Sequence, residues 1–162
     1  MMINDKSDTC PFCNASVLAS VYYSRDNFMA IYNIAPVLPG HSLVIPKKHM
    51  TGVLELSNDE LFEFFDTARI ALRILMRAFN TDAFDWSVQE KPEAGQTIEH
   101  LHLHIVPRIK GDLTQPGDWY PLIQQNDNSI IDSFNRPRLH PGALEQITEE
   151  LKLVAKNLKL PL

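Results

Sequence analysis

The hydrophobic and polar positions of this chain first repeat every second residue and later repeat with a helical period. Residues 17–23 and 28–34 are rich in β-branched and aromatic side chains, and the turn-forming stretch 24–27 separates them. This pattern predicts a β-hairpin. Residues 42–45 predict a third strand, and residues 84–90 predict a fourth. These segments are expected to build most of a sheet.

Two apolar stripes follow the period of an α-helix. Ser57, with Glu60 three positions later, matches a capping box, in which each side chain accepts from the other residue's backbone N–H. The stripe that follows is expected to face the core and consists of Leu61, Phe62, Phe65, Ala68, Leu72, Leu75, Met76 and Phe79. A second amphipathic helix is predicted from Leu144, Ile147, Leu151, Val154 and Leu158. Strands with one long helix packed on them and a C-terminal helix predict an α+β fold with a mostly antiparallel sheet.

Residues 99–107 alternate histidine with apolar residues. Because successive side chains of a strand point to opposite faces, Leu101, Leu103 and Ile105 are expected in the core, and the histidines on the other face. Histidine titrates near neutral pH, so three imidazoles on one face indicate a chemical role. Same-face positions lie about 6.5 to 7 Å apart, which is too far for all three rings to bind one metal ion. The histidines are therefore expected to have different roles.

Composition limits the kinds of partner. One compact domain is expected from 162 residues, of which 44% are hydrophobic. The net charge of −5 argues against a sequence-independent nucleic-acid binder, so an anionic ligand would have to be held by local groups. Residues 1–8 lack the apolar run of a signal peptide, and no run of about 18 apolar residues occurs. We therefore expect a cytoplasmic protein with no nucleic-acid or membrane partner, in which Cys10 and Cys13 form a metal clip or a redox pair.

Two segments read as loops. Residues 91–95 form a Pro/Gly turn beside the imidazole face, where backbone N–H groups could receive an anion. Residues 111–141 are rich in Gly, Pro, Asn and Asp, which predicts an irregular surface segment that Trp119 and Tyr120 anchor. His140 is expected to be a surface histidine.

The histidine strand carries the most specific signal in the sequence. A neutral imidazole is a nucleophile at pH 7, and a second imidazole two residues away can supply a proton donor. Residues 100–106 resemble the histidine triad motif, in which histidines alternate with apolar residues and two apolar residues follow the last histidine. Residues 89–99 resemble the segment before the triad in the fragile histidine triad branch, and residues 39–46 resemble a second landmark of the family. The resemblance covers about residues 10 to 110.

The resemblance implies a nucleotide hydrolase or transferase. In this family the middle histidine attacks the α-phosphorus of a nucleotide, so His102 is implied to form a covalent nucleotidyl-histidine that water then releases. His104 would contact the phosphate and help to neutralise the leaving oxygen, and Gln96 would hydrogen-bond the phosphate oxygens. His41 would support the strand that carries the triad. Sister transferases have glutamine at the third histidine, so His104 favours water as the final acceptor.

The same resemblance implies further contacts with the substrate. Asn33 matches the position that holds the ribose hydroxyls, and Ile31 and Leu43 are candidate walls of the base pocket. Amide, backbone or hydroxyl contacts are implied for Gln89, Gly95 and Thr97. It also implies a homodimer, with a HIT domain over residues 1–110 and a C-terminal extension over residues 111–162 that packs on the same domain.

The cysteine pair departs from the fragile branch and resembles zinc-bearing members of the superfamily. Transferred by position, their ligands would be Cys10, Cys13, His49 and His100. A Cys₂His₂ set suits a structural zinc ion with tetrahedral geometry. A thiol pair without a metal remains the alternative.

We expect a hydrolase that cleaves dinucleoside polyphosphates, such as diadenosine tri- or tetraphosphate, to a mononucleotide. A nucleoside phosphoramidase and a dinucleoside polyphosphate phosphorylase fit the same motif. A metal-dependent enzyme of the cupin kind is disfavoured, because no glutamate follows His104 at a suitable distance. A nucleotide-binding signalling module with slow turnover is the remaining alternative.

Overall fold

A five-stranded antiparallel sheet forms the centre of the molecule. The computed structural model describes residues 9–124 and 136–158, so the stretch 1–8, which lacks the pattern of a signal peptide, lies outside the described residues. Neighbouring strands pair in the order β1 (Val21–Ser24), β2 (Phe28–Tyr32), β3 (Ser42–Pro46), β5 (Leu103–Arg108) and β4 (Ala83–Val88). Every pairing is antiparallel. The predicted α+β fold with an antiparallel sheet is confirmed.

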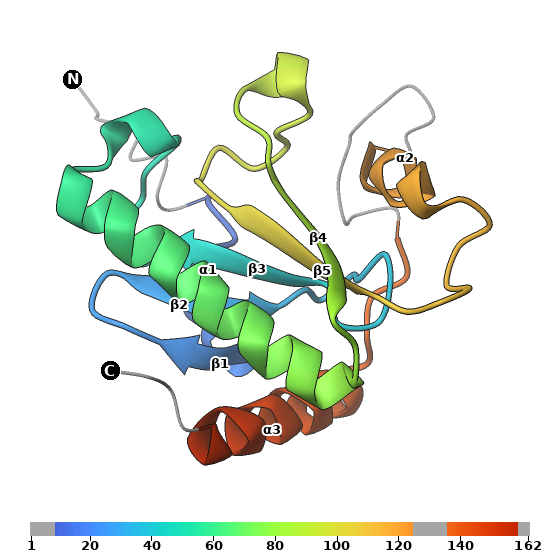
Figure 1. The fold of residues 1–162 in the computed structure, drawn as a ribbon. Helices are drawn as coiled ribbons and strands as arrows, with labels where there is room; N and C mark the ends of the chain where they lie inside the picture. The colour runs from blue at the N-terminus through green and yellow to red at the C-terminus, as the bar shows by residue number, and fades with distance from the viewer. Residues whose placement is uncertain (1–8, 125–135, 159–162) are drawn as a thin grey trace, which may run out of the picture.

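One long helix covers one face of the sheet, and the C-terminal helix packs beside it. Helix α1 (Asn58–Phe79) lies across β2, β3 and β5, and α3 (Pro141–Asn157) contacts α1 and β1 (Figure 1). The predicted capping box is present, because the Ser57 hydroxyl accepts from the Glu60 N–H and the Glu60 carboxylate accepts from the Ser57 N–H. In the described part of the chain, no helix combines the length and hydropathy that a bilayer crossing needs.

Both faces of the central strands are covered. On the helix side, Phe28, Leu103 and Ile105 pack with residues of α1 and α3 in the main core. On the other side, a smaller cluster of Met29, Ile31, Leu43 and Ile45 lies under Phe12 and Val17 of the N-terminal segment. Strands β2 and β3 are buried throughout for this reason. The second face also holds the histidines.

Two predicted strands begin later than expected. Residues 17–20 of the first predicted strand, 17–23, instead belong to the 3₁₀ helix η1 (Ala15–Ser20), which the Asn14 side chain caps by accepting from the Ser16 N–H at 2.9 Å. The histidine strand becomes regular only at Leu103, so His100 and His102 lie in the connection before β5. Leu101, Leu103 and Ile105 are buried as predicted.

The core-facing stripe of α1 is shifted from its predicted positions. Phe62 is 72% exposed and Phe65 is 41% exposed, whereas Phe64 is fully buried against Phe28. Phe62 lies about 200° around the helix from Phe64, because each residue turns the helix by about 100°. The prediction that Leu61, Phe62 and Phe65 face the core is therefore wrong.

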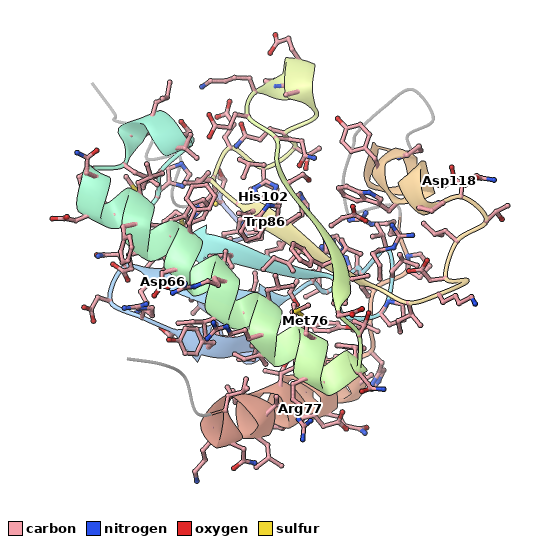
Figure 2. All side chains as sticks on the ribbon, in the orientation of Figure 1. Asp66, Met76, Arg77, Trp86, His102 and Asp118 are labelled. Carbon is pink, nitrogen blue, oxygen red and sulfur yellow. The ribbon has the colours of Figure 1, made fainter. Side chains whose placement is uncertain are left out.

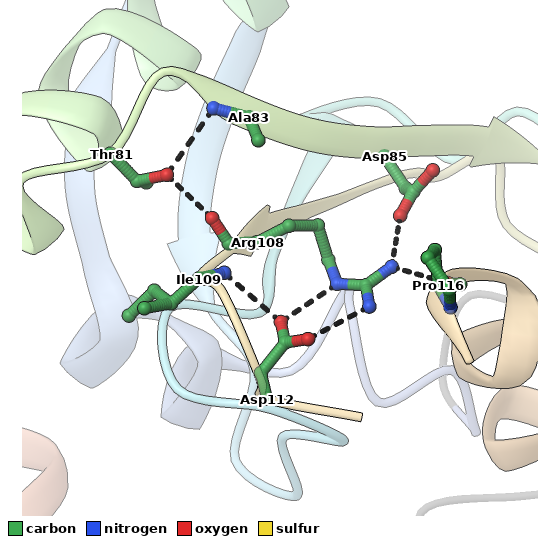
Figure 3. A network of polar contacts seen from close by, with 7 residues as sticks. All are labelled: Thr81, Ala83, Asp85, Arg108, Ile109, Asp112 and Pro116. Atoms are coloured by element: carbon green, nitrogen blue, oxygen red, sulfur yellow. Dashed lines mark hydrogen bonds and ion pairs between the residues drawn. The ribbon is translucent and has the colours of Figure 1, made fainter. Parts of the chain in front are cut away.

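An arginine at the end of β5 ties the sheet to the segment that follows it. The Arg108 guanidinium donates to both carboxylate oxygens of Asp112, to Asp85 of β4 and to the Pro116 carbonyl oxygen (Figure 3). The hydrogen bonds from Arg108 lower the pKa of Asp112 to about 2. The Thr81 hydroxyl donates to the Arg108 carbonyl oxygen.

The segment after β5 is less irregular than predicted. Its described part contains the 3₁₀ helix η4 (Pro116–Asp118) and the short helix α2 (Trp119–Gln124). The rings of Trp119 and Tyr120 pack edge to face with centroids 5.8 Å apart. Two further 3₁₀ turns, η2 (Val53–Glu55) and η3 (Pro92–Ala94), lie before α1 and before the histidine segment. Residues 125–135 of the predicted irregular segment lie outside the described residues.

Candidate functional site

Backbone hydrogen bonds orient the middle histidine. His100 donates its N–H to the Ile98 carbonyl at 2.7 Å, and Leu101 donates to the Met50 carbonyl at 2.6 Å, so the connection before β5 is fixed at both positions. His102 Nδ1 lies 2.7 Å from the His100 carbonyl oxygen. A carbonyl oxygen only accepts, so Nδ1 carries the proton and the lone pair of the neutral ring lies on Nε2. His102 is 5% exposed and lies just before β5 (Figure 2).

A second chain of hydrogen bonds orients His104. The Val37 N–H donates to His41 Nδ1 at 3.2 Å, which places the His41 proton on Nε2. His41 Nε2 then donates to His104 Nδ1 at 2.9 Å. The proton of His104 is therefore on Nε2, where it can be donated to a ligand.

Burial keeps these imidazoles neutral. Desolvation, followed by the positive charge of Arg136, lowers the pKa of His41 to about 3. Desolvation also lowers the pKa of His104 well below its usual value, and His102, His41 and Arg136 lower it further. The hydrogen bonds thus make His102 Nε2 an acceptor and His104 Nε2–H a donor.

The histidines open into a pocket of about 310 Å³. Of the predicted substrate contacts, the pocket wall includes Ile31, Asn33, Leu43, Gly95, Thr97, His102 and His104. The Asn33 side-chain oxygen accepts from the Ala35 N–H at 2.9 Å, so its amide nitrogen lies on the side of His41, 3.5 Å from Nε2. The structure brings these residues together; their roles stay predictions.

Three of the predicted residues do not line the pocket. Gln96 accepts from the Lys91 N–H at 2.7 Å and donates to the Thr51 carbonyl at 3.1 Å, so its side chain braces the loop before the triad. Gln89 is 5% exposed and donates to Ser87, while its buried side-chain oxygen lacks a partner. His41 lies within hydrogen-bond distance of His104, and its support of the triad strand stays a prediction. Contacts of Gln89 and Gln96 with phosphate oxygens stay predictions.

The backbone N–H of Gly95, which was predicted to donate to the substrate, forms a hydrogen bond within its own turn. Its N–H donates to the Pro92 carbonyl oxygen at 2.9 Å. Gly95 has a φ of +90°, in the left-handed region that glycine adopts without strain. Gly95 lines the pocket and has no side chain, so it leaves room there for a ligand. Its N–H is not the donor to the substrate that the sequence predicted.

Cys10, Cys13, His49 and His100 form one cluster whose potential ligand atoms all lie within 4.8 Å of one another. His100 Nδ1 is 3.4 Å from Cys10 Sγ and 3.6 Å from Cys13 Sγ, and His49 Nδ1 is 3.4 Å from Cys13 Sγ. Tetrahedral zinc with N and S ligands separates its ligand atoms by about 3.3 to 3.8 Å.

The hydrogen bonds of His100 also suit a metal ligand. His100 Nε2 donates to the Pro46 carbonyl oxygen at 2.9 Å, which leaves the lone pair on Nδ1, the atom that faces the sulfurs. A backbone carbonyl that accepts from the other ring nitrogen is the usual support of a metal-bound histidine. The residues present therefore fit a zinc ion.

The pocket also contains residues that the sequence did not predict. Phe12, between the two cysteines, packs its ring edge-on against His100 and His102 at 5.6 Å each. Its position between two predicted ligands could have indicated this contact. Arg136 and Arg138 line the pocket from the segment before α3. No motif marked them, because a long predicted loop separates them from the histidines in sequence.

A family model described as HIT domain matches residues 15–111. An asymmetrical bis(5'-nucleosyl)-tetraphosphatase from Schizosaccharomyces pombe is 31% identical over 76% of this chain and 68% of its own length. A bis(5'-adenosyl)-triphosphatase from Dictyostelium discoideum is 30% identical over 82% of this chain and 80% of its own length. The crystal structure of a hypothetical histidine triad nucleotide-binding protein from Sulfolobus tokodaii is 28% identical, with a TM-score of 0.71 over 93% of this chain and 94% of that one.

Proposed function

The chain belongs to the HIT domain family, and we propose that it hydrolyses dinucleoside polyphosphates of the diadenosine tri- and tetraphosphate type at the α-phosphorus. Two relatives that match most of the chain are named as hydrolases of such compounds. The observation that carries the proposal is the 2.7 Å hydrogen bond from His102 Nδ1 to the His100 carbonyl oxygen. It leaves the lone pair on Nε2 of a residue that lines the pocket.

The reaction is a pair of displacements at phosphorus. In the first, the lone pair of His102 Nε2 forms a bond to the α-phosphorus as the bond to the leaving nucleotide's oxygen breaks, and that oxygen takes the electron pair. His104 Nε2–H donates to the phosphate and so reduces the charge that develops there. The resulting nucleotidyl-imidazolium is a good leaving group. Water then attacks the phosphorus, the N–P bond returns its electrons to Nε2, and a mononucleotide and a proton leave.

The pocket walls suit a nucleoside beside that phosphate. Ile31 and Leu43 offer apolar side chains to the base, and the Asn33 amide is a hydrogen-bonding group for the ribose hydroxyls. Thr97 contributes a hydroxyl on the phosphate side. Together they account for recognition of the 5′-nucleotide half that is transferred to His102.

A structural zinc ion is part of the proposal. Cys10, Cys13, His49 and His100 would hold it, and the ion would join the N-terminal segment to the connection that carries His102. The bound ion supplies a rigid cross-link rather than chemistry at the phosphate. The thiolates that bind zinc persist in a reducing compartment, so we propose a cytoplasmic protein.

A homodimer is also proposed, with β4 at its centre. This strand lies at an edge of the sheet. Trp86 and Phe84 on β4 are each 39% exposed, and Phe65 of α1 packs beside Trp86 with ring centroids 6.1 Å apart. Edge strands with exposed aromatic residues are suited to pairing with a second copy.

A product assay tests the proposed reaction. The wild-type protein is offered diadenosine triphosphate, diadenosine tetraphosphate and an adenosine phosphoramidate, each with and without inorganic phosphate. We expect AMP from the polyphosphates without added phosphate. Turnover confined to the phosphoramidate would assign a phosphoramidase, and a requirement for phosphate would assign a phosphorylase.

The nucleophile is tested by substitution. His102→Asn is expected to lower kcat by at least about 10⁴-fold, as loss of a covalent nucleophile does, and to prevent labelling of the protein by a substrate labelled at the α-phosphate. Nucleotide binding should persist, because the pocket walls are unchanged. Labelling of the variant would remove His102 from this role.

A further inference from the structure

The described wall of the pocket contains cations but no carboxylate. The chain carries a net charge of −5, yet no carboxylate lines the pocket among the described residues. Burial lowers the pKa of His104, one of the histidines there, well below its usual value, so that this ring is neutral. Arg136 and Arg138 are the only permanent cations among the described lining residues. A ligand with several phosphates is an anion, and these two side chains are the cations of the described wall that can approach it.

The backbone fixes the segment that carries both arginines. The Leu139 N–H donates to the Ile34 carbonyl oxygen at 2.8 Å, and Ile34 is itself a pocket residue. The Leu139 side chain packs against the main core. The segment 136–139 is therefore held along the pocket rim, just before α3 begins, and is not a free tail.

Arg136 lines the same pocket as the histidines of the triad strand. It is half-buried, and its positive charge acts on both His41 and His104. A half-buried guanidinium interacts with an anion more strongly than an exposed one, because less water screens the pair. Its planar array of donors also matches the oxygens of a phosphate group.

From this placement we infer that Arg136, assisted by Arg138 at the exposed rim, binds the phosphate chain of the ligand. The C-terminal extension thus supplies the cations of a site whose nucleophile comes from the sheet. The inference rests on the proposed function for its ligand class, a nucleoside with two or more phosphates. It also divides the binding of the ligand between two groups of residues. Arg136 contributes to the affinity for the phosphates, and Asn33 and its neighbours contribute to the affinity for the nucleoside.

The test separates phosphate from nucleoside binding. In a His102→Asn background, which does not consume the ligands, binding of adenosine, ADP and diadenosine triphosphate is measured by calorimetry. Arg136→Gln should raise the Kd for the two phosphate-bearing ligands by about tenfold or more, since a hydrogen bond to a charged group contributes about 1.5 to 3 kcal/mol. The Kd for adenosine should change less than about twofold, because it carries no phosphate to bind.

Arg77→Gln is the matched control, because it removes the same charge from the exposed end of α1, far from His102 (Figure 2). It should leave all three affinities unchanged. Arg136→Lys should restore part of the affinity for ADP. If circular dichroism shows that Arg136→Gln does not fold, Arg136→Met, which keeps the aliphatic stem, carries the same expectation.

Two results would overturn the inference. An equal loss for adenosine and ADP would mean that Arg136 only packs the pocket wall, and no loss for either would mean that it does not meet the ligand. The proposed reaction fails separately, if the wild-type protein leaves both dinucleoside polyphosphates uncleaved. The binding comparison remains decisive in that case, because it needs no turnover.

Discussion

Each imidazole around the pocket has one nitrogen committed to a protein partner. The His100 carbonyl fixes His102, the Val37 N–H fixes His41, and His41 in turn fixes His104. The other ring nitrogen, Nε2, is therefore an acceptor at His102 and a donor at His104. A nucleophile next to a proton donor needs this difference, and backbone geometry supplies it without a charged residue.

Burial of these rings makes stability depend on pH. In the folded chain the pKa of His41 is lowered to about 3, and that of His104 is also lowered. Below about pH 6.5 the unfolded chain binds more protons than the folded one. The stabilisation that comes from these neutral histidines should therefore be complete above about pH 6.5. Below that pH, the free energy of unfolding should fall by up to about 1.4 kcal/mol per pH unit for each histidine.

Urea unfolding at several pH values between about 7.5 and 4.5 checks this expectation. His140→Gln, at an exposed position, should show the same pH dependence as the wild-type protein. Asp112, with its pKa lowered to about 2, loses its stabilising interaction only at more acidic pH. Stability that stays flat from pH 7 to pH 5 would contradict the neutral assignment of His41 and His104.

At the scale of single residues, the sequence predicted the positions of side chains that belong to short, regularly spaced motifs. From the alternating histidines and the Cys-x-x-Cys pair, Cys10, Cys13 and His100 were expected to lie together, and they belong to one cluster. Arg136 was not predicted, because its position depends on how a long segment returns to the pocket rim. Gln96 was predicted to face phosphate, yet backbone groups occupy both ends of its amide; sequence spacing does not report such competition.

Among the elements, the turn before β3 sets the position of His41. Gly40 has a φ of +86°, and a Cβ built there would lie 2.7 Å from Pro107 Cγ and 3.0 Å from the Phe79 ring. Gly40→Ala is expected to lower the free energy of unfolding by about 2 to 4 kcal/mol, from backbone strain and overpacking together. Gly117→Ala is the control, because a Cβ there meets nothing within 4 Å.

Chemical denaturation of both variants provides the measurement. The control should lie within about 0.5 kcal/mol of the wild-type value. Equal stabilities for Gly40→Ala and the wild-type protein would mean that the turn relaxes without cost.

The zinc cluster joins the N-terminal segment to the connection before β5. Cys10→Ser removes one ligand, so zinc content and Tm should fall together. Zinc at a hundred times its Kd stabilises a fold by about 2.7 kcal/mol, which is about 5 to 10 °C in Tm for a chain of this size. Metal analysis and a thermal melt give the two readings.

A chelator provides the control for this variant. It should lower the Tm of the wild-type protein towards that of Cys10→Ser and leave the variant unchanged. Full zinc content in Cys10→Ser, or a wild-type Tm that the chelator does not change, would disprove the proposed ligand set.

Whether a segment forms a helix or a strand was predictable wherever its hydrophobic pattern repeats over many residues. The capping box at Ser57 and the terminal apolar stripe gave α1 and α3 correctly. The exact face of α1 was not predictable, because Phe64 and Phe65 are chemically alike and only the sheet decides which is buried. Residues 15–20 have strand propensity but form a 3₁₀ turn, where Asn14 and Ser20 satisfy backbone groups locally.

For the whole molecule, the exposed edge of the sheet predicts association. Trp86→Glu places a charge on the aromatic surface of β4 and should convert a dimer into a monomer. Light scattering should give twice the 18.5 kDa chain mass for the wild-type protein and the single mass for the variant. Leu153→Glu, at a position of α3 that is 60% exposed, should stay dimeric. A wild-type mass of one chain would contradict the proposed dimer.

Both flanks of the described chain contribute to the wall of the pocket. Cys10 approaches His100 from the N-terminal side, and Leu139 fixes the rim segment to Ile34 from the C-terminal side. A chain emerging from the ribosome can form the β2–β3 hairpin early, but the pocket lacks part of its wall until residue 139 has been translated. The pocket therefore gains its full wall only after the segment 136–139 has been made, and a nascent chain stalled after the triad would display the histidines without Arg136 and Arg138 beside them.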